Sequence, residues 1–298
     1  MCIRDRSNTG LDVADASLAA SFADYDNDGD LDCYLLTNRY YRANGRPTGA
    51  PAKLENGVAV VFKEYEQYYR IKQEGAKKFT IEEYGRADRL FRNNGDGTFE
   101  EVTEASKITG IGHGLSMMWW DYDSDGWVDI YVCNDFDDPD CLWRNNGDGT
   151  FTNVIARAMP HTTWFSMGSD LADVNNDGLL DFFSVDMSAT NHFKQKTTMG
   201  AMNSQRIRDV SGPPQQTMRN SLLLNTGTGR FLEAAYLAGV ADSDWSWSPK
   251  FADYDCDGRV DLFISNGMAR NFTDSDVCLL YTSPSPRDRT RSRMPSSA

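Results

Sequence analysis

Short apolar segments alternate along this chain with acidic turns that contain glycine. The segments that follow such a turn are CYLLT from Cys33, IYVCN from Ile130, FFSVD from Phe182 and LFISN from Leu262. Other apolar segments precede a turn, such as SFAD at Ser21 and MMWW at Met117. Apolar runs of this length, bounded by turn residues, are typical of β-strands. The pattern therefore predicts that each acidic turn joins two β-strands.

The acidic turn is a nine-residue stretch that occurs four times: DYDNDGDLD, DYDSDGWVD, DVNNDGLLD and DYDCDGRVD. Side-chain oxygens stand at positions 1, 3, 5 and 9 and glycine at position 6, which suits a hard divalent cation in a tight turn. Position 7 would offer its backbone carbonyl. The candidate ligands are Asp24, Asp26, Asp28, Asp30 and Asp32; Asp121, Asp123, Asp125, Trp127 and Asp129; Asp173, Asn175, Asp177, Leu179 and Asp181; and Asp253, Asp255, Asp257, Arg259 and Asp261.

Two other interpretations of these loops are less consistent with the sequence. A single acidic turn is often only a solvated surface loop, but four copies with the same glycine and the same closing aspartate favour a metal site. An EF-hand requires a glutamate at position 12 and flanking helices. Those positions hold Leu35, Val132, Ser184 and Ile264 instead.

A second motif, RNNGDGTF at Arg92 and Arg144 and LNTGTGRF at Leu224, lies between strand-like runs and predicts a hairpin turn. Gly95 and Asp121 are 26 residues apart, and so are Gly147 and Asp173. A unit of four short strands repeated at such a spacing predicts an all-β fold, a β-propeller with a metal loop between the first two strands of each blade. The expected blades are 17–103, 115–155, 165–235 and 245–276, with insertions at about 39–83 and 187–214.

The stretches GHGLSMMWWDYDSDGWVDIYVCNDF, PHTTWFSMGSDLADVNNDGLLD and LFISNGMARNF carry a family resemblance. They resemble the FG-GAP/VCBS repeats of integrin α-chain-like propellers. The closer resemblance is to bacterial secreted proteins related to cartilage acidic protein, which often carry an ASPIC/UnbV domain. This resemblance implies that the four loops bind up to four Ca²⁺ ions and that the protein is secreted, periplasmic or on the cell surface.

Both ends differ in character from the rest of the chain. MCIRDRS at the start and the Ser-, Pro- and Arg-rich segment after Val277 resemble translated sequencing-adapter read-through. We therefore expect residues 1–14 and 277–298 to be non-native or disordered and residues 15–276 to form a partial propeller. The fourth blade would then contain only its first two strands, so that about three and a half blades are present.

Strand alternation places both insertions on the face opposite the metal loops. YYRIKQEGAKKFTIEEY in the first insertion predicts a small hairpin that turns at Glu74 and Gly75. The candidate interaction face comprises His113, His161, His192, Lys194 and Lys196. Three histidines on one face suit a metal or acid–base site, but no fixed ligand spacing links them. Separate loop histidines with backbone hydrogen bonds are the favoured interpretation.

The net charge of −14 argues against a nucleic-acid partner, and no apolar run is long enough to span a membrane. Cys33, Cys133, Cys141 and Cys256 show no zinc spacing and are expected to be thiols. The favoured function is a non-enzymatic, calcium-stabilised scaffold of an exported bacterial protein that binds a protein or a glycan. The alternatives are a hydrolase-type enzyme with its site on the insertion face, using His113, His161 or His192, and a propeller lectin.

Overall fold

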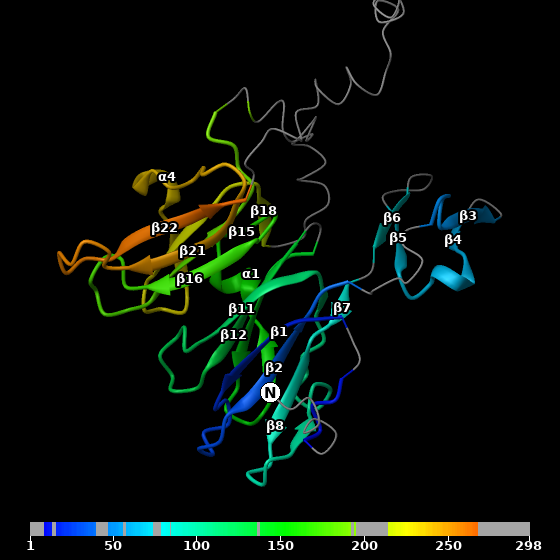
Figure 1. Ribbon diagram of the computed structural model, residues 1–298, viewed down its shortest axis with the longest axis horizontal. Helices are drawn as coiled ribbons and strands as arrows, with labels where there is room; N and C mark the ends of the chain where they lie inside the picture. Colours follow the sequence, from blue (N-terminus) through cyan, green and yellow to red (C-terminus); the bar gives the residue numbers. More distant parts are fainter. Residues whose placement is uncertain are drawn as a thin grey trace, which may run out of the picture.

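The computed structural model describes residues 9–13, 16–39, 47–55, 58–73, 79–83, 85–135, 138–191, 194 and 214–267. Three four-stranded sheets and a fourth strand pair form the body of this part of the chain (Figure 1). Sheet one contains β1 (Ser17–Ala23), β2 (Asp32–Thr37), β8 (Arg89–Asn93) and β9 (Phe99–Glu101). Sheet two contains β11 (Gly114–Trp120), β12 (Asp129–Asn134), β13 (Cys141–Asn145) and β14 (Phe151–Asn153). Sheet three contains β16 (Gly168–Ala172), β17 (Asp181–Val185), β19 (Ser221–Asn225) and β20 (Phe231–Glu233), and the fourth pair contains β21 (Ser246–Ala252) and β22 (Asp261–Asn266).

Each four-stranded sheet is an antiparallel meander in which strands that are neighbours in the unit are also neighbours in the sheet. The first two strands pair up to the edge of the acidic loop, so that the closing aspartate of the loop is the first residue of the second strand. The pairs at this edge are Ala23 with Asp32, Trp120 with Asp129, Ala172 with Asp181 and Ala252 with Asp261. The prediction that every acidic loop joins two strands is confirmed.

The sheets are arranged in the manner of a β-propeller. The first strand of each sheet contacts the first strand of the next, in the order β1, β11, β16 and β21. The sheets therefore stack face to face, and every residue of β12 is buried because sheets one and three cover its two faces. This is an all-β, propeller-like fold, as the repeat spacing predicts.

The hydrophobic core lies between successive sheets rather than at one centre. Side chains alternate between the two faces of a strand, so that Ile130 and Val132 of β12 pack toward sheet one while Tyr131 and Cys133 pack toward sheet three. Between sheets two and three, Tyr131 contacts Phe182 with ring centroids 4.2 Å apart. Trp120 stacks on Phe182 at 6.0 Å in the same layer.

The first insertion contains two hairpins that stand away from the sheets (Figure 1). One is β3 (Ala52–Glu55) with β4 (Val58–Val61), and the other is β5 (Tyr69–Gln73) with β6 (Phe79–Glu83). The second confirms the hairpin expected here, although its turn lies outside the described residues. The first was not predicted. Most of the second insertion also lies outside the described residues, as do the expected non-native tail at 277–298 and much of 1–14.

Several short elements in the connections were not predicted. β7 (Arg86–Ala87) pairs with β10 (Ile111–Gly112), and β15 (His161–Thr163) pairs in parallel with β18 (Gln215–Thr217). A 3₁₀ helix spans Lys63–Tyr65, and two one-turn helices, α1 (Ile155–Ala158) and α4 (Ala235–Ala238), follow the outer strands β14 and β20. Within the described ranges no helix has the length and apolar character needed to cross a membrane. The cysteines Cys33, Cys133, Cys141 and Cys256 are free thiols.

Candidate metal centres

The four acidic loops share one backbone conformation. Position 6 is glycine with positive φ in every loop, as predicted, and position 4 also has positive φ although it is never glycine. The position 4 residues are Asn27 (φ 58°), Ser124 (57°), Asn176 (59°) and Cys256 (61°). Asparagine tolerates this left-handed conformation better than most residues do. Two left-handed residues in one short loop turn the chain back on itself and direct the side chains at positions 1, 3 and 9 to a common centre.

Backbone amides fix two of the aspartates in each loop. The position 1 carboxylate accepts the N–H groups of positions 5 and 6, as in Asp121, which accepts from Asp125 and Gly126 at 3.0 Å each. The position 5 carboxylate accepts the N–H of position 7, as in Asp125 with Trp127 at 3.0 Å. The same bonds recur in the other three loops. The loops therefore hold their shape through hydrogen bonds that each copy makes within itself.

The closing aspartate is the most buried member of each loop in the three complete sheets. Asp129 accepts the N–H of Tyr122 at 3.1 Å and that of Asn145, from the hairpin motif, at 2.7 Å. Burial, reinforced by Asp123 and Asp125, raises the pKa of Asp129 to about 7 despite these bonds. Burial likewise raises the pKa of Asp32 to about 6. A carboxylate with this environment gains from a nearby cation.

Carboxylate oxygens from positions 1, 3 and 9 lie within 4.8 Å of one another in three of the loops. The clusters are Asp24, Asp26 and Asp32; Asp121, Asp123 and Asp129; and Asp253, Asp255 and Asp261. The third loop has Asn175 at position 3 and so has one carboxylate fewer. In the first two loops, Oδ1 of the position 3 aspartate is buried without a hydrogen-bond partner. An acceptor left bare beside two other carboxylates fits a hard cation, because Ca²⁺ takes oxygen ligands.

The hairpin motif lies beside these loops, and its first asparagine links neighbouring sheets. Nδ2 of Asn145 donates to the carbonyl of Tyr25 in the loop of sheet one at 2.8 Å and to that of Val128 in its own loop at 3.2 Å. Asn225 repeats the arrangement with Tyr122 and Leu180. The sequence predicted a structural hairpin here, but it gave no sign that this side chain joins one sheet to the next.

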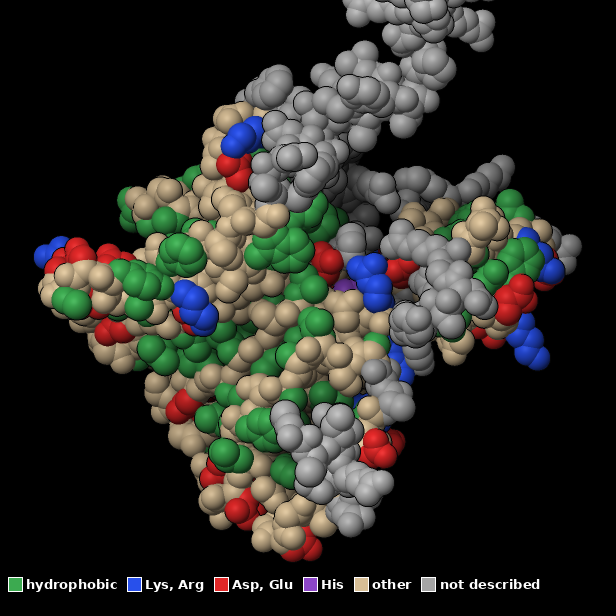
Figure 2. Space-filling model, in the orientation of Figure 1, with side chains coloured by type: hydrophobic (Ala, Val, Ile, Leu, Met, Phe, Trp, Pro, Cys, Tyr) green, Lys and Arg blue, Asp and Glu red, His purple; other side chains and the backbone are tan. Residues whose placement is uncertain are grey.

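The first residue of the hairpin motif also reaches a loop. In sheet two, the guanidinium of Arg144 donates from Nε to Oδ2 of Asp123 and from Nη2 to Oδ2 of Asp125, both at 2.6 Å. Figure 2 shows acidic side chains gathered at the tips of the molecule where such loops project. Arg144 therefore places a positive charge directly against two aspartates of the second loop.

The two described histidines of the candidate interaction face belong to separate ion-pair networks. His113 contacts Asp138 at 2.8 Å, and Arg70 of the β5–β6 hairpin binds the other oxygen of Asp138 at 2.7 Å. His161 contacts Glu233 at 3.0 Å, and Glu233 also pairs with Arg219. His161 also makes the expected kind of backbone contact, from Nδ1 to the carbonyl oxygen of Thr162 at 3.3 Å. The carboxylate partners were not predicted, and the two histidines share none of the partners named here.

The lysine part of that face is only partly described. Lys194 pairs with Asp244 at 2.6 Å, an interaction that lowers the pKa of Asp244 although partial burial acts in the opposite direction. His192 and Lys196 lie outside the described residues. A catalytic role for His113, His161 or His192 therefore stays a prediction.

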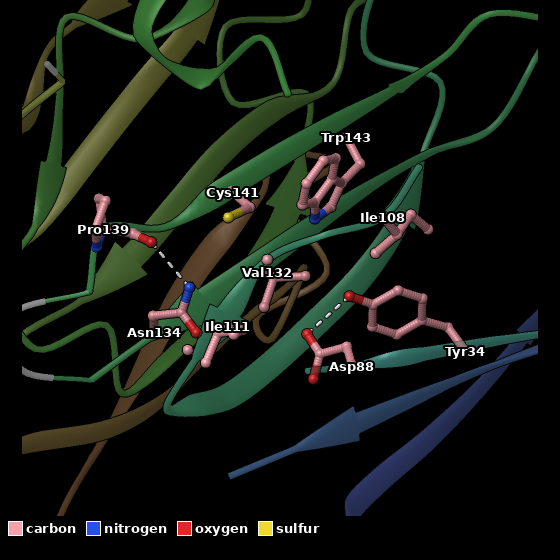
Figure 3. Close-up of a pocket in the computed structure, with 11 residues that line it drawn as sticks. Tyr34, Asp88, Ile108, Ile111, Val132, Asn134, Pro139, Cys141 and Trp143 are labelled. Carbon is pink, nitrogen blue, oxygen red and sulfur yellow. Dashed lines mark hydrogen bonds between the residues drawn. The ribbon is translucent and has the colours of Figure 1, made fainter. Parts of the chain in front are cut away.

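A small cavity of about 130 Å³ lies between sheets one and two (Figure 3). Tyr34 and Asp88 of sheet one line it, together with Trp143 of sheet two. Asp88 accepts the Tyr34 hydroxyl at 2.8 Å, and burial raises the pKa of Asp88 to about 6. Trp143 is only 5% exposed and belongs to the core between the sheets. It therefore provides no open aromatic platform of the kind that the lectin alternative requires.

The same polar arrangement recurs between sheets two and three. There, Asp140 accepts the Tyr131 hydroxyl at 2.8 Å and the Ser166 hydroxyl at 2.7 Å. The residue that occupies the position of Ser166 in sheet two is Gly114, which has no side chain to offer. The buried aspartate–tyrosine pair is therefore part of the repeat.

Comparisons with known proteins place the repeats in a family. No curated protein sequence matches this chain. A solved structure of an Agrocybe aegerita lectin that recognises non-reducing terminal N-acetylglucosamine is similar at 17% identity with a TM-score of 0.35. The match covers 84% of this chain and spans 60% of the length of that one. The FG-GAP-like repeat family matches residues 79–132, 121–184 and 209–264. Because these matches together span more than half of the chain, the protein belongs to the FG-GAP-like repeat family.

Proposed function

We propose that this protein is a calcium-binding β-propeller scaffold in which each acidic loop holds one Ca²⁺. The observation that carries the proposal is the carboxylate cluster of positions 1, 3 and 9 in loops one, two and four, whose oxygens lie within 4.8 Å of one another. The buried, unpartnered Oδ1 atoms of Asp26 and Asp123 support it. The position 5 side chain and the position 7 carbonyl would complete the oxygen shell that calcium requires.

The role of calcium in this proposal is structural. Each loop joins the first two strands of a sheet, and its closing aspartate also accepts an N–H from the hairpin of the same sheet in the three complete sheets. A divalent ion would remove the repulsion within each cluster. It would thereby hold the loop edge of the sheet together.

We also propose that the sheets are blades of a propeller and that further strands cover both ends of the described fan. On β1, Leu18 and Phe22 are 52% and 49% exposed, although the corresponding strands of sheets two and three are covered by a neighbour. On β22, Phe263 is 58% exposed. Phe263 corresponds to Tyr131 of β12, which pairs with the third strand of sheet two. The favoured occupants of these open surfaces are further blade strands.

The biological role that we propose is binding of a protein or glycan partner outside the cell, without catalysis. Extracellular modules commonly use weak calcium sites because calcium is plentiful there. The separate networks of His113 and His161 support a binding role over a shared acid–base centre. The proposed export, the bacterial ASPIC/UnbV relationship and the identity of the partner all rest on the sequence resemblance.

Isothermal titration of the calcium-free protein with calcium chloride tests the metal proposal. The expected result is saturable binding that Asp123→Asn and Asp26→Asn each reduce, because each change removes a carboxylate charge while it keeps an oxygen. Lys53→Gln is a matched surface control that changes a charge far from the loops and should leave binding unaltered. Absence of saturable binding in the unaltered protein would overturn the proposal.

A further inference from the structure

Arg144 binds the second acidic loop, a contact that the equivalent residues Arg92 and Leu224 do not make with loops one and three. Its guanidinium bridges Oδ2 of Asp123 and Oδ2 of Asp125, at 2.6 Å each. The side chains of these two aspartates are 16% and 28% exposed, so that the contacts are partly shielded from water. Oδ1 of Asp123 stays buried without a partner. The arginine therefore neutralises the outer oxygens of the loop and leaves the inner oxygen available.

The equivalent residue in sheet one makes a different contact, and the residue across the strand explains why. Arg92 is paired in the sheet with Glu100, and its guanidinium binds that carboxylate at 2.8 Å. Arg144 is paired with Thr152, which carries no charge. The guanidinium of Arg144 has no acidic neighbour on β14 at that position, and it reaches the loop instead.

Sheet three lacks a cation at this position altogether. The corresponding residue is Leu224, and its cross-strand partner is Leu232. The three loops thus share one backbone geometry, but the charged groups that the neighbouring hairpin places beside them differ. The first hairpin has an arginine held by glutamate, the second has an arginine held by the loop, and the third has no arginine.

We propose that Arg144 is a built-in counter-ion that lowers the cation affinity of the second loop and stabilises this loop in the absence of metal. This inference rests on the proposed calcium function. Loops one and two have the same aspartates at positions 1, 3, 5 and 9, and they differ at position 7, where loop one has Asp30 and loop two has Trp127. Arg144 binds two aspartates of the second loop directly, whereas Arg92 binds Glu100. A fixed positive charge beside the site repels an incoming divalent ion.

A favourable effect of Arg144 through ordering of the loop is expected to be smaller. The first loop makes the same internal backbone hydrogen bonds without an arginine on its aspartates. The second loop therefore has little further order to gain from Arg144. The charge effect should dominate, so that removal of the Arg144 guanidinium should tighten cation binding at the second loop.

The test compares three variants with the unaltered protein. Arg144→Leu copies sheet three, and Thr152→Glu copies sheet one by supplying a carboxylate that draws Arg144 away from the loop. Arg92→Leu is the matched control, because Arg92 is bound to Glu100 and not to a loop aspartate. The probe is terbium(III), a calcium substitute whose luminescence is excited through tryptophan. Trp127 lies within the second loop, so the signal reports chiefly on that loop.

Arg144→Leu and Thr152→Glu should each tighten terbium binding at the second loop by about tenfold, because one positive charge is removed from the vicinity of the ion. Arg92→Leu should change it by less than about twofold, since a surface ion pair is screened by water. Calcium should displace the terbium, and the calcium affinities of the variants should follow the same order as their terbium affinities. Weaker or unchanged binding in Arg144→Leu, or no effect of Thr152→Glu, would overturn the proposal.

A second readout separates this inference from the calcium proposal. In excess chelator, Arg144→Leu should lower the melting temperature relative to Arg92→Leu, because the second loop loses its internal cation. If the unaltered protein bound no cation, the calcium proposal would fail while this melting difference still reported on the counter-ion role. Equal melting temperatures of the two metal-free variants would reject that role.

Discussion

Replacement of Asn145 by alanine should destabilise the protein far more than the same change at the equivalent position in sheet one. Asn145 is fully buried, and its side chain donates to the carbonyls of Tyr25 and Val128 and accepts the N–H of Gly147. Truncation would leave these groups without their partner. A buried polar group without a partner costs about 1–3 kcal/mol. Since the Tyr25 carbonyl and the Gly147 N–H would both lose the Asn145 side chain as a partner, we expect a loss of about 3 kcal/mol in the free energy of unfolding.

Asn93 provides the matched control, because it occupies the same motif position at the edge of the described fan. Its side chain bonds only to Leu31 of its own loop and to Gly95, and both bonds are exposed to water. Asn93→Ala should therefore cost about 1 kcal/mol, the typical net value of one hydrogen bond. Asn145→Asp should be at least as damaging as Asn145→Ala, because it removes the donor and adds a buried charge.

Urea unfolding followed by tryptophan fluorescence, at fixed calcium concentration, measures these differences. The unfolding midpoint should fall most in the two Asn145 variants and least in Asn93→Ala. Equal losses for Asn145→Ala and Asn93→Ala would refute the reasoning, since they would show that the link between sheets one and two contributes nothing to stability.

Three further changes test other parts of the structure. Asn175→Asp should tighten calcium binding at the third loop in a titration, because it restores the missing carboxylate; weaker binding would contradict this ranking. Burial raises the pKa of Asp140 from 3.8 to about 7, because the folded protein favours the protonated carboxyl. The stability that this group contributes is therefore fully present below pH 3.8 and is lost as the pH rises through 7 and the buried carboxyl ionises. Asp140→Asn, which copies Asn220 of sheet three, should flatten that pH dependence of melting, and an unchanged profile would exclude Asp140 as its source. Trp120→Ala should cost about 3–5 kcal/mol in urea unfolding because Trp120 packs against Phe182, and a loss under about 1 kcal/mol would contradict that packing.

The strands and loops could be predicted because their signal is local and repeated. Each acidic loop carries its own glycine and its own closing aspartate, and the strands beside it are short apolar runs. Four copies at regular spacing turn a weak local pattern into a repeat, and the repeat determines the order of strands in each sheet. The hairpin of β5 and β6 was predictable for the same reason, since its two strands lie on either side of one turn.

Contacts between sheets could not be predicted, because nothing in the local pattern specifies them. The bond from Asn145 to Tyr25 joins residues 120 positions apart in the chain. The different contacts of Arg92 and Arg144 depend on whether residue 100 or 152 across the strand is acidic, and this register becomes known only when the strands are paired. The parallel pairing of His161–Thr163 with Gln215–Thr217 likewise joins two connections that show no strand periodicity.

The calcium dependence of thermal unfolding tests the central claim most directly. The protein should be melted at equal ionic strength in saturating calcium, in magnesium and in excess chelator. A ligand at a hundred times its dissociation constant adds about 2.7 kcal/mol per site to the free energy of unfolding. For a protein of this size, even one such site should raise the melting temperature by about 5–10 °C in calcium relative to chelator. A melting temperature that is the same in calcium and in chelator would contradict a structural role for calcium in these loops.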